Sequence, residues 1–252
     1  STANCSSAMI VLNTIMAKQL QDFKVSVDAR IKSGDGKDEA ILKELQKLIK
    51  ESKKIRFEGN GYGEEWVKEA KSRGLSNLMD TPRALQAWSG EGVADLFNDM
   101  GVLTPVELKA RQEIEFETYI YKIQIEARVI GDMVQNFIIP PAIEYQNKLI
   151  QNVQGLMDVL GAKSGKIASN AQVEIIEKIS EHMNAMKEIN DKMLVTRKKA
   201  NKIEGHEKKA IAYCDTVKIH FDEIRYHVDK LELLIDDEAW RMPKFREMLF
   251  TR

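Results

Sequence analysis

Thr104-Pro-Val-Glu-Leu108 opens the stretch that decides the fold, and Asn136-Phe-Ile-Ile-Pro140-Pro-Ala-Ile-Glu-Tyr145 lies at its centre. Thr104 suits an N-cap, Pro105 suits the first helical position, and Glu107 completes a capping box. Apolar residues then recur every three or four positions, which predicts one buried helix side. These residues are Ile114, Ile120 or Tyr121, Ile125, Val129, Met133 and Phe137.

Pro140 and Pro141 remove two backbone donors, so we expect the helix to kink or break there. The helical pattern resumes at once and continues to about Leu160, with apolar residues at Ile143, Leu149, Ile150, Val153 and Met157. At about 1.5 Å per residue this element is longer than a small domain is wide. It is stable only if other long helices lie along it.

Further helices are expected on both sides of this stretch. A helix over residues 8–32 has an apolar side made of Leu12, Met16, Leu20, Phe23 and Val27. A second helix, capped by Asp38, has an apolar side made of Ile41, Leu42, Leu45, Leu48 and Ile49. Shorter helices are expected at 64–73, after Thr81-Pro82 and before Gly101. Beyond a loop at Gly161–Gly165 follow helices 170–204, capped by Asn170 and broken at Gly205, and 206–235. The apolar tail Trp240–Phe250 is expected to dock.

The predicted fold is therefore all-α. It is a long antiparallel helical bundle with a central helix kinked at Pro140-Pro141, plus shorter N-terminal helices. The net charge of −1 provides no global field that favours nucleic acid or an acidic membrane, and no apolar run is long enough to span a bilayer. Cys5 and Cys214 suit reduced thiols better than a disulfide framework. We therefore expect no nucleic-acid or membrane partner.

Two glycine-containing stretches resemble nucleotide-binding loops without matching them. Gly161-Ala-Lys-Ser-Gly165-Lys-Ile has three residues between its glycines where a phosphate-binding loop has four, and Ile where that loop needs Ser or Thr. Gly59-Asn-Gly-Tyr-Gly63 is not a dinucleotide fingerprint. We interpret both as structural turns.

The histidines and the basic run do not form a recognisable site either. A di-iron bundle needs a carboxylate three residues before a His. In this sequence an apolar residue takes that position before each histidine: Ile179 before His182, Ile203 before His206, Val217 before His220 and Ile224 before His227. Arg197-Lys-Lys199 and Lys202 suit a solvated helix end. No Ser-His-Asp or Cys-His arrangement is defensible. The prediction is that no residue of this chain is catalytic, cofactor-binding or metal-ligating.

Several blocks nonetheless resemble one family, the type III glutamine synthetases, near their C-terminal end. The blocks occur in order at Ile10–Ala17, Phe57–Val67 continuing to Arg73–Leu78, Thr81–Leu85, Gly101–Leu108, Ile138–Tyr145 and Met242–Phe250. The resemblance is weak at about 28–52 and 158–205.

This resemblance implies a parent enzyme that is an ATP-dependent glutamate–ammonia ligase of nitrogen assimilation. Such chemistry needs ATP and Mg²⁺ or Mn²⁺, because the transferring phosphoryl group carries charge that must be neutralised. The family also implies a cytoplasmic homo-oligomer built of stacked rings. Residues 1–80 resemble the closing helices of the catalytic domain, and residues 81–252 resemble the helical extension particular to type III.

The family's metal ligands lie on strands, and its last Glu-x-Arg strand motif precedes the point that resembles Ser1. We therefore expect this chain to be an inactive C-terminal fragment with a structural, assembly or regulatory role, whose partner is the N-terminal remainder of the parent chain. The alternative is a free-standing helical-bundle interaction or scaffold protein. The reading frame upstream of Ser1 discriminates the two. A fragment should also leave the apolar side of residues 8–32 without its partner.

Overall fold

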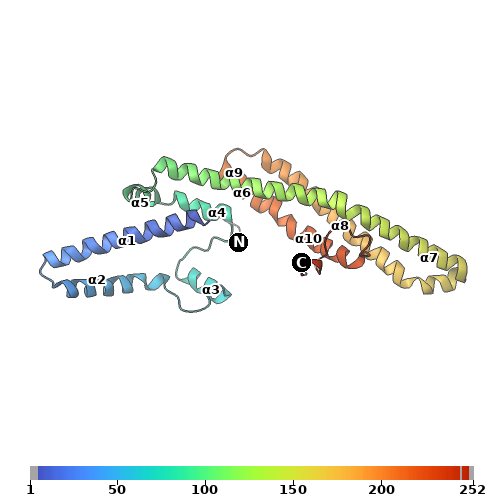
Figure 1. The fold of residues 1–252 in the computed structure, drawn as a ribbon, viewed down its shortest axis with the longest axis horizontal. Coiled ribbons are helices and arrows are strands. Elements are labelled where there is room, and N and C mark those ends of the chain that lie inside the picture. Colours follow the sequence, from blue (N-terminus) through green and yellow to red (C-terminus); the bar gives the residue numbers. More distant parts are fainter. Residues whose placement is uncertain (1–4, 245, 250–252) are drawn as a thin grey trace. The chain divides into compact units, whose positions relative to one another are not determined.

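The computed structural model describes residues 5–244 and 246–249, and the regular elements of these residues are all helical (Figure 1). The α-helices are α1 (Ser6–Lys32), α2 (Lys37–Glu51), α3 (Glu64–Ser72), α4 (Thr81–Gln86), α5 (Val93–Asp99), α6 (Pro105–Met133), α7 (Ile139–Ala168), α8 (Asn170–Asn201), α9 (His206–Ala212) and α10 (Ile219–Leu234). Two π-helical segments, η3 (Val134–Ile138) and η4 (Tyr213–Lys218), join α6 to α7 and α9 to α10. Short 3₁₀ turns are η1 (Ser52–Ile55), η2 (Ala87–Ser89) and η5 (Glu247–Leu249). The predicted all-α class is confirmed.

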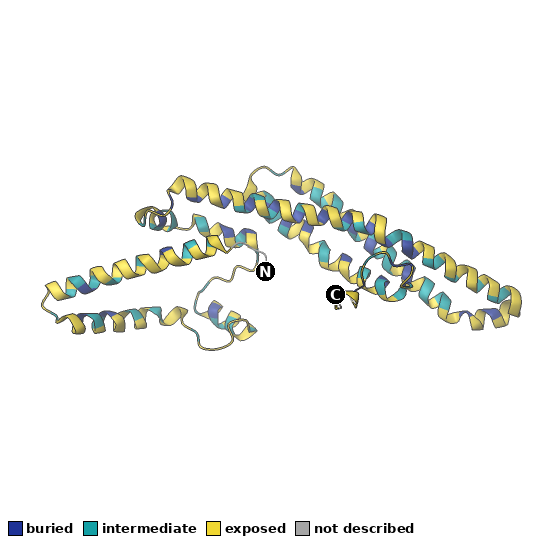
Figure 2. Cartoon of the chain, in the orientation of Figure 1, coloured by how far each residue is buried: buried dark blue, intermediate teal, exposed yellow. Residues whose placement is uncertain are grey.

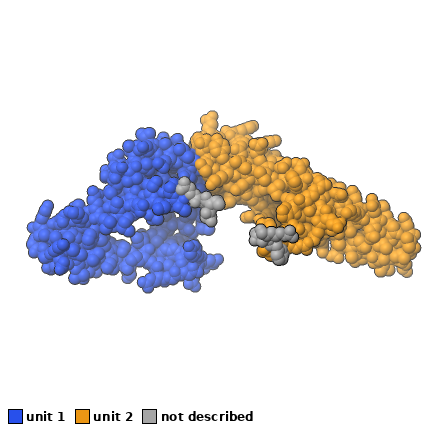
Figure 3. Space-filling model, viewed as in Figure 1, with its two compact units in different colours: residues 1–115 blue, residues 116–252 orange. Residues whose placement is uncertain are grey.

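The chain separates into two compact units, residues 1–115 and 116–252, with the boundary inside α6 (Figure 3). In the first unit, Phe97, Leu103 and Leu108 form a buried cluster against Ile10 and Val11 of α1. Trp88, Val93 and Ala94 complete this cluster. The predicted boundary near residue 80 concerns segments of the resembling family and stays a prediction.

The start of α6 has the predicted capping box. The Thr104 backbone N–H donates to Glu107 Oε2 at 2.8 Å, and the Glu107 N–H donates to Thr104 Oγ1 at 3.3 Å. The pKa of the Glu107 carboxyl is lowered first by the bond from the Thr104 backbone N–H and then by a bond from the Thr104 hydroxyl to the same Oε2 at 2.8 Å. Local sequence therefore sets the beginning of this helix, as capping chemistry requires.

The buried side of α6 differs from the predicted one. Along α6 and η3, Ile114, Tyr121, Ile125, Val129 and Phe137 are exposed. The buried residues are Ile120, the other predicted alternative to Tyr121, and Leu108, Gln112, Phe116, Ile123, Ala127 and Val134. Both sets recur at helical spacing, so periodicity alone does not choose between them. The buried set includes Gln112, which donates to Leu85 O at 2.7 Å and accepts from Ser89 Oγ at 2.7 Å.

At Pro140-Pro141, where a kink or break was expected, the helix continues after a π turn. The segment η3 ends at Ile138, immediately before the prolines, and α7 begins at Ile139 with no interruption of the helical path. In the π turn the Ile139 N–H donates to Val134 O, five residues earlier, and the two prolines that follow have no N–H to donate. Pro141 and Ala142 are buried.

The second unit is a bundle in which α8 packs against α7 and α10 packs against α8 (Figure 2). The apolar spacing of the sequence predicts Ile179, Met186 and Met193 on the inward side of helix 170–204, and Val217, Ile224 and Leu231 on that of helix 206–235. All six are buried. The Gly205 break is confirmed by its φ of 85°, although α8 ends at Asn201 rather than Glu204.

The loop predicted at Gly161–Gly165 is only one residue wide. Gly161 alone leaves helical geometry, with φ 76° and ψ 160°, and the residues after it are helical again. A Cβ added at Gly165 would lie 2.6 Å from Met157 Cα, so this glycine allows the last turn to pack against the preceding helix. The next helix is not capped by Asn170, because Asn170 is its first residue and Ser169 occupies the N-cap position. Likewise Asp38 lies in the first turn of α2, whose N-cap is Gly36.

The first part of the tail docks, as expected, whereas Met248 and Leu249 further along are exposed. Trp240 and Lys244 are buried, and the Lys244 ammonium donates to Glu232 O at 2.8 Å and Ile235 O at 3.0 Å. These carbonyls belong to the end of α10, so Lys244 caps that helix. Phe250 lies outside the described residues.

Asn190 of α8 is fully buried, and neither Oδ1 nor Nδ2 has a hydrogen-bond partner among the described residues. Since a buried amide without partners costs desolvation energy, Asn190→Leu is expected to raise the free energy of unfolding by about 1–2 kcal/mol. Chemical denaturation measures this change.

Asn201→Leu provides the contrast on the same helix. The Asn201 Oδ1 accepts from the hydroxyl of buried Tyr213 at 2.6 Å, so its loss is expected to destabilise the protein by about 1–2 kcal/mol. If Asn190→Leu also destabilises, the buried amide has a structural role.

Candidate functional site

The N-terminal half of α1 carries an apolar stripe that nothing in the described chain covers. Met9, Leu12, Met16 and Leu20 lie on one side of the helix and are 59–66% exposed. The stripe continues into Val27, which is buried, so only its first half lacks a partner. The predicted inward side is therefore confirmed only near Val27. Clustered exposed apolar side chains are typical of an interaction surface.

The helix α2 faces α1 with a different side from the predicted one. Its buried residues are Ala40 and Glu44, whereas Leu42, Leu45 and Ile49 are exposed. The apolar side of α2 therefore forms a second uncovered surface. We call these three residues, together with Met9, Leu12, Met16 and Leu20, the hairpin apolar surface.

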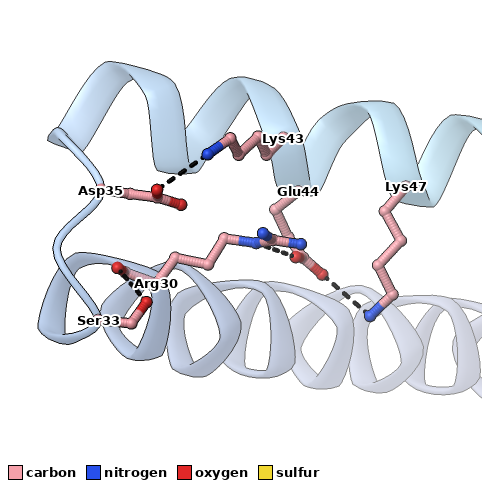
Figure 4. A network of polar contacts seen from close by, with 6 residues as sticks. All are labelled: Arg30, Ser33, Asp35, Lys43, Glu44 and Lys47. Carbon is pink, nitrogen blue, oxygen red and sulfur yellow. Dashed lines mark hydrogen bonds and ion pairs between the residues drawn. The ribbon is translucent and has the colours of Figure 1, made fainter.

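An ion-pair network links α1 to α2 (Figure 4). Arg30 Nε donates to Glu44 Oε2 at 3.0 Å, and Lys47 Nζ lies 3.4 Å from Glu44 Oε1. Lys43 Nζ donates to Asp35 Oδ1 at 2.9 Å across the connecting turn. The hydrogen bond from Arg30 is the largest cause of a lowered pKa for Glu44. A buried carboxylate needs such partners.

Glu44→Gln is expected to loosen the α1–α2 hairpin without unfolding the second unit. The pKa of Glu44 is lowered in the folded protein, so its contribution is complete above the unfolded pKa and is lost as pH falls through the folded one. Amide hydrogen exchange of residues 6–51, followed from neutral to acidic pH, measures this effect. Equal acid sensitivity in wild type and Glu44→Gln contradicts it.

The glycine-containing loop Gly59–Gly63 precedes α3, as a structural turn would. The Phe57 ring stacks on the Trp66 ring with centroids 4.3 Å apart, and the Arg73 guanidinium lies over Trp66 at 5.5 Å. Arg73 also donates to Arg56 O at 2.8 Å. These contacts fix the ends of the loop.

The histidines singled out by sequence have different surroundings. His206 lines a groove of about 280 Å³ with Glu117, Tyr121, Asn201 and Lys209. His220 lies 3.8 Å from the Glu223 carboxylate, whereas His182 and His227 approach each other across two helices. Sequence spacing did not predict that pair, because its members are 45 residues apart.

Within residues 5–244 and 246–249, no group of three or more His, Cys, Asp or Glu side chains is placed to hold a metal ion. The same residues contain no helix with the length and apolarity needed to cross a membrane. The expectation that the chain has no catalytic, cofactor-binding or metal-ligating residue stays a prediction.

A family model described as the glutamine synthetase C-terminal domain matches residues 40–157. The chain is 42% identical, over all 252 residues, to a glutamine synthetase of Bacteroides fragilis (strain YCH46), of which it covers 35%. It is 32% identical over 243 residues, 96% of its length, to the type-3 glutamine synthetase of Dictyostelium discoideum, of which it covers 33%.

The chain belongs to the glutamine synthetase family, as a C-terminal part. The resemblance predicted from the ordered sequence blocks is thereby confirmed. The chain spans about a third of the length of the curated relatives it matches. The matched residues 40–157 include most of α2, where Leu42, Leu45 and Ile49 are exposed.

Proposed function

We propose that this chain is the C-terminal part of an ATP-dependent ligase that makes glutamine from glutamate and ammonia. The identity to named glutamine synthetases over the whole chain supports this proposal. The parent enzyme would use ATP with Mg²⁺ or Mn²⁺, act in the cytoplasm and assemble into rings. The described residues do not fit an ATP–metal site, since they bring no three potential metal ligands together. The catalytic groups are therefore proposed to lie elsewhere in the parent chain.

The role proposed for this part is docking and assembly. The observation that carries it is the hairpin apolar surface, whose α1 portion is a stripe of four residues at 59–66% exposure. Relatives about three times as long supply an occupant, namely the part of the parent chain outside these residues. Burial of apolar side chains is worth roughly 1.5–3 kcal/mol each, so such a surface can anchor one domain on another.

The direct test is an assay of two polypeptides. The complete product of the gene is expected to form glutamine from glutamate, ammonia and ATP, with release of phosphate. The 252-residue chain alone is expected to release none. Turnover by the chain alone overturns the proposal that the catalytic groups lie elsewhere in the parent chain. No turnover by the complete product overturns the proposed ligase activity.

A charge on the stripe tests the docking role. Leu20→Lys in the complete protein is expected to reduce soluble assembly and glutamine formation at least tenfold, because it places an ammonium in an apolar contact. Gln21→Lys, which is exposed on the adjacent side of α1, is the control and is expected to leave both unchanged. Analytical ultracentrifugation and the glutamine assay give the two measurements.

The competing proposal is a free-standing scaffold built on the bundle. It requires the chain to be monomeric and fully functional in partner binding without further residues. Concentration-dependent self-association of the 252-residue chain, abolished by Leu20→Lys but not by Gln21→Lys, favours the docking proposal. A stable monomer at all concentrations favours the scaffold.

A further inference from the structure

His182 of α8 and His227 of α10 bring two ring nitrogens together. Their Nδ1 atoms are 3.0 Å apart, and their ring centroids are 5.3 Å apart with planes tilted by 51°. Both side chains are half-buried, and the two helices that carry them pack against each other. The backbones of two rigid elements therefore set the separation of the nitrogens.

Two neutral imidazoles at this distance have two possible arrangements. One Nδ1 can carry a hydrogen and donate it to the other, or both rings can carry their hydrogens on Nε2 and direct two lone pairs at one ion. Zn²⁺ binds imidazole nitrogen at 2.0–2.1 Å in tetrahedral geometry, which places two such nitrogens about 3.3 Å apart. The observed 3.0 Å lies within a few tenths of that span.

The surroundings of the pair are acidic. The carboxylates of Glu181 and Glu223 act on the His227 ring with negative charge. The Tyr226 ring lies edge-on to both imidazoles and covers one side of the pair.

An open groove of about 500 Å³ reaches the His227 side of the pair. Its lining residues are Ile189, Asp222, Glu223, Tyr226 and His227. The groove is wide enough to admit a hydrated ion and to leave water molecules in the remaining coordination positions. Imidazole ligands suit Zn²⁺, Co²⁺, Ni²⁺ and Cu²⁺, whereas Mg²⁺ prefers oxygen.

We propose that His182 and His227 form a binding site for a divalent transition-metal ion, with the two Nδ1 atoms as its protein ligands. Water completes the coordination. Binding moves the bridging hydrogen from Nδ1 to Nε2 of the same ring, so no proton is released. The ion links α8 to α10 and stabilises the bundle. This site is independent of the ligase activity proposed above.

The test is a titration of the 252-residue chain with Co²⁺ and Ni²⁺ in a Cys5→Ser, Cys214→Ser background, which removes the competing thiol ligands. Calorimetry is expected to give one ion per chain, and thermal unfolding is expected to shift upward with metal concentration. His182→Gln and His227→Gln are each expected to weaken binding at least tenfold. The double variant His206→Gln, His220→Gln is the control and is expected to bind as the parent does.

A second measurement covers the case in which a variant does not fold. In the chain that keeps all four histidines, ¹⁵N NMR of the imidazoles is expected to show metal-dependent shifts at Nδ1 of His182 and His227. No such shift is expected at His206. Mg²⁺ is expected to cause no shift. No saturable binding of Co²⁺ or Ni²⁺ overturns the proposal, and so does equal affinity in a folded His182→Gln or His227→Gln chain.

Discussion

Gly165→Ala is expected to lower the free energy of unfolding by about 2–4 kcal/mol. A Cβ at this position would lie 2.6 Å from Met157 Cα, 2.9 Å from Leu156 O and 2.9 Å from Met157 N. All three atoms belong to the backbone, so no rotamer change can relieve the contact. The helical turn after Gly161 would have to move away from the part of α7 that precedes Gly161, and the entry into α8 would move with it.

Gly155→Ala is the matched control in the same helix. A Cβ there meets nothing within 4 Å, and the position is exposed. Alanine is expected to stabilise the helix by about 0.5–1 kcal/mol, because glycine has the higher entropy when unfolded. Urea denaturation of both variants measures the difference. Equal effects of the two substitutions would show that the approach at Gly165 does not constrain the turn.

Lys244→Met is expected to cost about 2–3 kcal/mol. The ammonium is nearly buried and donates to two carbonyls at the end of α10, and its Nζ lies 2.6 Å from Asp237 Oδ1. A cation at a helix C-terminus also interacts favourably with the helix dipole. Methionine keeps most of the buried aliphatic volume but leaves the carbonyls without their donor. The tail that includes Trp240 is then expected to detach from α10.

Lys198→Met, at an exposed position near the end of α8, is the control and is expected to change stability by less than about 0.5 kcal/mol. Trp240 fluorescence reports tail release together with denaturation. The pKa of Asp237 is lowered, with Lys244 as the first cause, so its contribution is full above the unfolded pKa and is lost as pH falls through the folded one. Lys244→Met is expected to reduce this acid dependence, and an unchanged pH profile contradicts the role of the pair.

Element type and several boundaries could be predicted from sequence because they depend on local chemistry. The Thr104–Glu107 capping box and the Gly205 break are decided within one or two turns of helix. The sides of α8 and α10 were also predictable, since each carries one dominant apolar stripe.

The buried sides of α2 and α6 could not be predicted in the same way. On α2, Glu44 faces α1 and pairs with Arg30, whereas Leu42 and Leu45 are exposed. On α6, Ile114 and Phe116 belong to two apolar stripes of similar strength. A helix that contacts more than one partner has more than one apolar side. The spacing of its apolar residues therefore does not identify which of these sides is buried in the described part of the chain.

The candidate site was predictable only in part. An uncovered apolar side of residues 8–32 was expected, and the exposure of Leu12, Met16 and Leu20 agrees with it. The second apolar surface on α2 was not expected. The approach of His182 to His227 was also missed, because it depends on the register of two helices that sequence leaves free.

The π turn at Val134–Ile138 has a consequence for how the chain tolerates insertions and deletions. One extra residue in that turn rotates everything downstream by about 100° relative to an uninterrupted helix. Removing a single residue there would restore regular winding and would keep Pro141 and Ala142 in the interior, because the deletion cancels the extra residue of the π turn. Adding a residue would instead rotate Pro141 and Ala142 by about 100° toward solvent. Related chains should therefore tolerate the loss of one residue between Val134 and Pro141, together with the π turn, better than the gain of one.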